Sequence, residues 1–171
     1  TPTASNTYTV TATALNGCTN TNTQSITVNS LPIINITTLP NDTICAGSSL
    51  SLTATGGSTY SWSGSITNAT PFTPTASSTY TVTVTSSYNC SNTSTQSITL
   101  NPLPTININV LPNDTVCAGT ALTINANGAS TYSWSGGITN ASPFTPAASN
   151  TYTVTATGSN SCTNTATQSI V

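Results

Sequence analysis

The strongest constraint on this chain is an internal repeat with a period of 72 residues. This interval separates every pair of landmark residues: Cys45 and Cys117, Cys90 and Cys162, Trp62 and Trp134, Asp42 and Asp114. Such a period is too long for one unit of a solenoid and suits a small self-contained domain. We therefore expect domains in a row, with complete repeats at 31–102 and 103–171. Residues 1–30 would be the C-terminal strands of a preceding repeat, or strands donated to a neighbouring subunit.

Within each repeat, apolar residues alternate with Thr or Ser, as in TYTVTVT at 79–85. Strict alternation is typical of half-buried β-strands, and β-branched Thr suits their solvent-facing side. Short strands separated by Gly, Pro, Asn and Ser predict an all-β fold of antiparallel sandwiches. A disordered, mucin-like stalk is the alternative for a chain rich in Ser, Thr and Pro, but it would not explain the alternation. We predict strands near 33–38, 48–55, 59–63, 66–73, 79–86 and 93–100, and again 72 residues later.

Six aromatic residues are expected in the cores of these sandwiches. They are Tyr60, Trp62, Tyr80, Tyr132, Trp134 and Tyr152. A Tyr-x-Trp pair places both rings on one face of a strand, because successive side chains point to opposite faces. The competing interpretation is an exposed aromatic platform that holds sugars, and an exposed Trp62 would favour it.

The cysteines recur with the repeat, and each complete repeat holds two of them, 45 residues apart. We call Cys45 and Cys117 the leading cysteines, because each precedes a predicted strand. We call Cys18, Cys90 and Cys162 the hairpin cysteines, because each falls in the turn between the last two predicted strands. If both positions lie at one end of a sandwich, intradomain bridges Cys45–Cys90 and Cys117–Cys162 are expected. Each would stabilise its domain by roughly 4 kcal/mol on a chain-entropy argument.

Cys18 is left over in this scheme. Its partner would lie before residue 1 in a longer chain, or in a neighbouring subunit. Because disulfides persist in oxidising compartments, we expect an extracellular or cell-surface protein. A metal site is not expected, since the chain has no CxxC motif and no His.

The chain carries almost no charge, with two acidic residues and no Lys, Arg or His. Without basic residues it cannot neutralise phosphates, so we expect it to bind neither nucleic acid nor anionic membranes. No apolar run approaches the roughly 18 residues of a membrane-spanning helix. Two isolated Asp with no neighbouring base cannot activate a nucleophile, so we expect no enzymatic activity and no cofactor. One Asp per repeat also supplies few ligands for calcium.

Both acidic residues lie in one recurring segment, PNDTICAG at 40–47 and PNDTVCAG at 112–119. Pro followed by Asn and Asp is typical of a turn ahead of a new strand. In each copy, Asp is followed by Thr and then by an aliphatic residue. This pattern resembles the O-glycosylation signal of secreted proteins of Bacteroidota, and the resemblance implies covalent glycans on Thr43 and Thr115.

The repeat as a whole resembles the Ig-like repeats of large secreted surface proteins of Bacteroidota. The matching residues are ICAG at 44–47, YSWS at 60–63, PTASSTYTV at 74–82, NC at 89–90 and QSIT at 96–99. The resemblance implies tandem Ig-like sandwiches, an intrachain bridge, and export to the cell surface, commonly by the type IX system. Proteins of this kind often serve as adhesins or stalks. The total lack of Lys and Arg departs from that family.

Three functions are compatible with these observations. The first is a structural array, an extracellular stalk or a filament in which near-neutral domains pack against copies of themselves. The second is an adhesin module whose loops or aromatic residues bind surface glycans or a partner cell. The third is an accessory domain of an enzyme, which only the flanking sequence would reveal.

Overall fold

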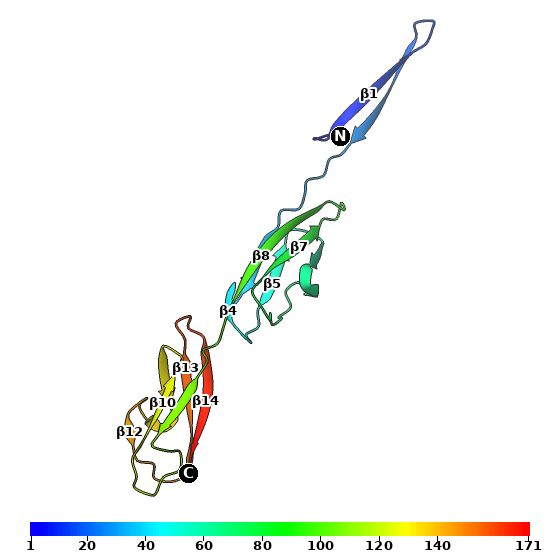
Figure 1. Cartoon of the computed structure of the whole chain (residues 1–171). Coiled ribbons are helices and arrows are strands. Elements are labelled where there is room, and N and C mark those ends of the chain that lie inside the picture. The colour runs from blue at the N-terminus through cyan, green and yellow to red at the C-terminus, as the bar shows by residue number, and fades with distance from the viewer. The chain divides into compact units, whose positions relative to one another are not determined.

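The computed structural model describes residues 1–171 and consists of β-strands and two short 3-10 turns (Figure 1). The all-β fold class expected from the alternating pattern is confirmed. The structure holds no helix with the length and hydropathy required to cross a membrane. The elements are β1 (Asn6–Thr13), β2 (Thr19–Ile26), β3 (Asn35–Leu39), β4 (Thr43–Cys45), β5 (Ser51–Thr55), β6 (Thr59–Trp62), η1 (Ser63–Ser65), β7 (Ser78–Thr85), β8 (Ser91–Asn101), β9 (Asn107–Leu111), β10 (Leu122–Asn127), β11 (Thr131–Trp134), η2 (Ser135–Gly137), β12 (Pro143–Phe144), β13 (Asn150–Thr157) and β14 (Thr163–Ile170).

Each complete sequence repeat contributes two sheets. In residues 31–102 these are β3-β5 and the four-stranded sheet β4-β8-β7-β6. In residues 103–171 they are β12-β10-β9 and β11-β13-β14. The short strand β4 pairs with the end of β8 in parallel orientation. Strands β1 and β2 form a separate two-stranded antiparallel hairpin.

The chain divides by internal contacts into two compact units. The first unit comprises Thr1–Pro40, Leu50–Phe72 and Thr79–Ser97. The second comprises Asn41–Ser49, Thr73–Ser78 and Ile98–Val171. These boundaries differ from the repeat boundaries, because β4 and the end of β8 belong to the second unit. The domain limits at residues 30 and 102 therefore stay a prediction.

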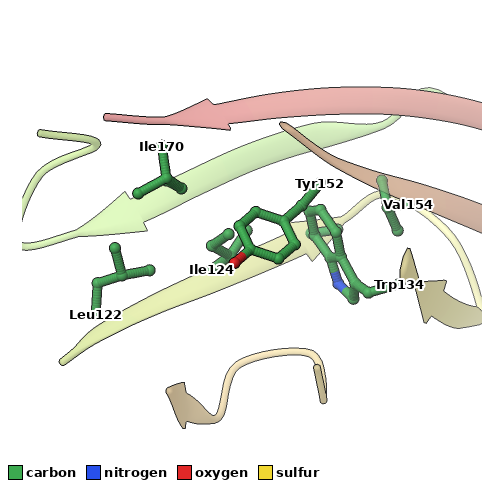
Figure 2. Packing of buried hydrophobic residues seen from close by; sticks show 7 residues of the cluster. Leu122, Ile124, Trp134, Tyr152, Val154 and Ile170 are labelled. Atoms are coloured by element: carbon green, nitrogen blue, oxygen red, sulfur yellow. The ribbon is translucent and has the colours of Figure 1, made fainter. Parts of the chain in front are cut away.

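The core of the second unit lies between the two sheets of residues 103–171. Leu122 and Ile124 of β10 meet Tyr152, Val154 and Ile170 of the facing sheet, as Figure 2 shows. Val154 is fully buried, and the other four side chains are at most 7% exposed. Such a layer between two sheets is the packing that the period-two pattern predicts.

The first unit has an equivalent set of buried side chains. Leu50, Leu52 and Ala54 are at most 2% exposed, and Val82 and Val84 are fully buried. Leu52 and Ala54 alternate along β5, Val82 and Val84 alternate along β7, and Leu50 continues the first series just before β5, so the apolar face of each strand is the buried one.

The segment predicted as a strand at 66–73 is largely irregular. A 3-10 turn at Ser63–Ser65 precedes it, and its one ladder contact is an isolated bridge between Leu50 and Phe72. In the second repeat the corresponding pairing is the two-residue strand β12. Gly64 and Gly136 have φ angles of 72° and 71°, a conformation that interrupts strand geometry and suits glycine.

Candidate functional site

The only disulfide bond in the structure joins Cys45 to Cys162, with Cα atoms 5.6 Å apart and a sequence separation of 117. It links a leading cysteine of repeat 31–102 to the hairpin cysteine of repeat 103–171. The predicted bridges Cys45–Cys90 and Cys117–Cys162 are therefore wrong. Cys18, Cys90 and Cys117 are free thiols.

The intradomain pairing fails because the two cysteine positions of one repeat lie at opposite ends of its last strand. In the second repeat, Cys162 immediately precedes β14. Val116, the neighbour of Cys117, donates its backbone N–H to the carbonyl of Val171, just beyond the other end of β14. The eight residues of β14 span roughly 25 Å at about 3.3 Å per residue. A disulfide needs Cα atoms within about 7 Å, so these sulfurs cannot meet.

The first repeat shows the same arrangement along β8. Cys90 precedes the strand at Ser91, and Cys45 is the register partner of Asn101 at its far end. The Ala46 N–H donates to the Asn101 carbonyl over 2.8 Å, which fixes Cys45 beside the last residue of the strand. A leading cysteine therefore lies where its own repeat ends and the next one begins.

Asparagine side chains fasten the hairpin end of each repeat to its proline-marked linker. Asn164 donates to the carbonyl of Pro104 over 3.0 Å, and Asn160 donates to that of Pro102 over 2.9 Å. Asn92 donates to Pro32 in the first repeat over 3.1 Å. These bonds hold the linker against the start of the last strand, beside the hairpin cysteine. In the second unit they bring Cys162 toward the chain that follows Asn101.

The segment around Asp42 is a turn ahead of β4, as its sequence indicates. The backbone carbonyl of Asp42 accepts a hydrogen bond from the N–H of Thr99 over 2.8 Å. The Thr43 hydroxyl donates to the Asp42 carboxylate at 3.4 Å, and Thr115 and Asp114 repeat this contact at the same distance. Both Thr side chains are exposed. The predicted glycan acceptors are thus accessible, and each carboxylate lies beside the hydroxyl that follows it.

The two tryptophans are core residues, each 7% exposed. Tyr152 is equally buried, whereas Tyr60, Tyr80 and Tyr132 are half-buried. Tyr80 and Tyr152 contact Phe72 and Phe144 edge-to-face, with ring centroids 5.2 Å apart in each pair. The Tyr60 and Tyr132 hydroxyls donate to the backbone carbonyls of Gly57 and Ala129. An exposed Trp and Tyr platform for sugars is absent from this arrangement.

Sequence reasoning missed two asparagines that hold the indole rings. The Asn140 side-chain oxygen accepts from the Trp134 Nε1–H at 2.9 Å and from the Ala126 N–H at 2.8 Å. Its amide group donates to the Ala126 carbonyl at 3.0 Å. Asn68 makes the same three bonds in the first repeat. A signal was present, because each Asn follows its Trp by six residues and recurs with the 72-residue period.

No model of a known protein family matches this chain, and no curated protein sequence matches it either. Among solved structures, the chain is similar to a Ca²⁺-stabilized adhesin that helps an Antarctic bacterium reach out and bind ice. The sequences are 15% identical, and the alignment has a TM-score of 0.38. It covers 98% of this chain and 56% of the adhesin chain, so this chain spans little more than half of that protein's length.

Proposed function

We propose that this chain is part of an extracellular structural array, a stalk or a filament built from tandem Ig-like domains. The observation that carries the proposal is the bridge between Cys45 of one sequence repeat and Cys162 of the next. Because of it, a pulling force that passes from one repeat to the next is shared between the backbone and a second covalent connection. A disulfide also indicates an oxidising, extracellular setting.

The composition supports the same function. The exposed faces of the strands carry Thr, Ser and Asn, and neither Lys nor Arg occurs in the chain. Such a surface offers no trypsin cleavage site and little electrostatic repulsion between copies. The two acidic residues have no basic side chain near them to form an acid–base pair, so a structural role fits the chain better than catalysis.

The adhesin alternative loses its main sequence argument, because Trp62 and Trp134 lie in the cores. Under the structural proposal, the partners of the chain are copies of itself rather than surface glycans. A glycan-binding screen of the purified chain separates the two functions, since saturable binding to a defined sugar would favour the adhesin.

Electron microscopy of the native protein, isolated without reductant, tests the structural proposal. The expected result is fibres or stalks with a regular axial repeat. The same preparation in a thiol reductant is the matched control, and it should show shortened or frayed fibres if the bridges bear load. Dispersed particles without any fibres or stalks, in the absence of reductant, would contradict the proposal.

We also propose that Thr43 and Thr115 carry O-linked glycans. The exposed hydroxyls, each 3.4 Å from the preceding carboxylate, support this modification. Glycopeptide mass spectrometry of protein from its natural host should find a sugar on both residues. In the variants Asp42→Asn and Asp114→Asn the corresponding site should lose its glycan while the fold is retained. Unmodified Thr43 and Thr115 in the natural protein would remove the proposal.

A further inference from the structure

We propose that the Cys45–Cys162 bridge is one member of a regular series, in which the leading cysteine of each repeat bonds to the hairpin cysteine of the next. Under this rule, Cys117 bonds to the hairpin cysteine of a following repeat. Cys90 bonds to the leading cysteine of a preceding one, and Cys18 is a hairpin cysteine of the same kind. The rule does not depend on the stalk or filament function, because it concerns only which sulfur atoms bond.

The pattern of free and bonded cysteines follows from the rule. A leading cysteine and the hairpin cysteine of the next repeat are 117 residues apart, as in the observed bridge. Of all pairs among the five cysteines, only Cys45 and Cys162 have this separation, and only they are bonded. Pairing inside a repeat would instead give two bridges from the same cysteines, and neither is present.

Cysteines that form the disulfide are more buried than free cysteines at the equivalent position of another repeat. Among the hairpin cysteines, bonded Cys162 is fully buried, whereas free Cys90 is half-buried and free Cys18 is exposed. Among the leading cysteines, bonded Cys45 is half-buried, whereas free Cys117 is exposed. The whole hairpin around Cys18 is exposed, so only the cysteines of the two complete repeats compare bonded with free sulfurs in like surroundings. In both of those comparisons, the free cysteine is the more exposed one.

A surface hollow lies beside Cys117, where the hairpin segment of a following repeat would pack if it bonded to this cysteine. Val116 and Pro146 line it, both are half-buried, and its volume is about 220 Å³. Their equivalents beside the bonded Cys45 are Ile44 and Pro74, and both are buried. The apolar wall next to a leading cysteine is therefore covered where the bridge exists and open where it does not.

The surroundings of Cys90 point to a leading segment as its partner. The Cys90 Sγ lies 3.9 Å from the backbone carbonyl oxygen of Asn29. Asn29 is the repeat equivalent of Asn101, the residue beside which β4 places Cys45. A leading strand paired with residues 27–29 in the same parallel register would bring its cysteine to Cys90. The expected partner is a segment of the type Asp-Thr-aliphatic-Cys-Ala-Gly.

Forming each bond is a two-electron oxidation. The two S–H bonds break, one S–S bond forms, and two protons and two electrons pass to an external disulfide. Oxidised glutathione can serve as this oxidant and is converted to two molecules of the thiol.

The test adds one repeat to the chain. A copy of residues 100–171 is appended after Val171, and the extended chain is refolded with reduced and oxidised glutathione. Free thiols are then alkylated, and the unreduced protein is digested with chymotrypsin for mass spectrometry. We expect a new bond between Cys117 and the appended hairpin cysteine, while the Cys45–Cys162 bond is retained. Cys117 should change from fully alkylated in residues 1–171 to fully protected in the extended chain.

The rule is overturned if Cys117 bonds to Cys162 or is still alkylated in the extended chain. The control replaces the appended hairpin cysteine by Ser, which should return Cys117 to the alkylated state and leave Cys45–Cys162 intact. Mixing differently isotope-labelled chains identifies the source of the partner. A bond within one label means successive repeats of one polypeptide, and a mixed-label bond between a leading and a hairpin cysteine means a second copy. A bond between two leading cysteines would contradict the rule.

Discussion

Strands β1 and β13 have the same sequence, NTYTVTAT, yet they lie in opposite environments. Each pairs with the strand that follows it in the same register, Asn6 with Ile26 and Asn150 with Ile170. The cross-strand hydrogen bond between the Thr7 and Ser25 hydroxyls also recurs in the second hairpin, between Thr151 and Ser169, at 2.9 Å in both. The pairing of each hairpin is therefore encoded locally.

Burial distinguishes the two hairpins. Tyr8 and Val10 are 50% and 65% exposed, whereas Tyr152 and Val154 are 7% and 0% exposed. The second hairpin faces β10 and packs beside β11, and the first has no facing sheet. A two-stranded hairpin alone is marginally stable in water, so the stability of this sequence comes from the sheet it packs against. The sequence of a hairpin determines its strand register, and packing against the rest of the repeat determines how stable it is.

The largest expected difference between the hairpins is at the tyrosine. Tyr152→Ala removes a buried ring that contacts Phe144, and we expect it to lower the free energy of unfolding by about 3–5 kcal/mol. Tyr8→Ala, its matched control, should change stability by less than about 0.5 kcal/mol. Urea unfolding followed by tryptophan fluorescence measures both. Equal losses in the two variants would mean that the first hairpin is packed against a sheet after all.

The next largest effect is expected at Asn140, whose amide bonds to β10 and β11, the strands beside the second hairpin that have no counterpart beside the first. Asn140→Ala leaves the Trp134 indole N–H and the Ala126 backbone without partners, which costs about 2–3 kcal/mol. The control is Asn20→Ala in exposed β2, expected to have an effect below about 0.5 kcal/mol. The same urea titration reports both variants. An Asn140→Ala protein as stable as the parent would show that the indole does not depend on this amide.

A smaller difference is expected at the valines. Val154→Ala removes two buried carbon atoms and should cost about 2 kcal/mol, counting the transfer of the methyl groups and the cavity left behind. Val10→Ala removes the same atoms from a side chain that is 65% exposed and should be nearly neutral. Thermal unfolding followed by circular dichroism compares the pair. A loss of similar size at Val10 would contradict the exposed state of the first hairpin.

The smallest effect is expected where the strand sequences of the two hairpins differ. Strands β2 and β14 differ only at Asn22, where the second hairpin has Ala166. Asn22→Ala makes both strands of the two hairpins identical, and we expect amide hydrogen exchange in β1 and β2 to stay fast. Protection rising to the level of β13 and β14 would show that sequence, rather than the missing sheet, distinguishes the hairpins.

The sequence was most informative for features that depend on a single strand, such as which of its side chains are buried. Alternation predicted β7 and β13 and the burial of Trp62 and Trp134, because side-chain direction within a strand depends only on local geometry. The cysteine pairing depended instead on which ends of different strands meet. The spacing of 45 residues was compatible with a shared end, and the structure places Cys117 and Cys162 at opposite ends of β14.

Contacts between different strands and loops could not be predicted from the alternation of residues within one strand. The three-residue strand β4 is too short to show alternation, and its parallel pairing with β8 positions Cys45. The indole contacts of Asn68 and Asn140 were hidden among many other Asn residues, most of which face solvent. The repeat retains Asn68 and Asn140 six residues after each Trp, but it retains other Asn pairs as well, among them Asn41 and Asn113.

The bridge connects cysteines of two consecutive sequence repeats. The most direct measurement is a disulfide map of residues 1–171, alkylated and then digested with chymotrypsin without reduction, because the chain has no Lys or Arg for trypsin. We expect one cross-linked peptide pair, containing Cys45 and Cys162. We also expect alkylation at the three other cysteines, Cys18, Cys90 and Cys117. Bridges Cys45–Cys90 and Cys117–Cys162 in the map would contradict a bond between consecutive repeats.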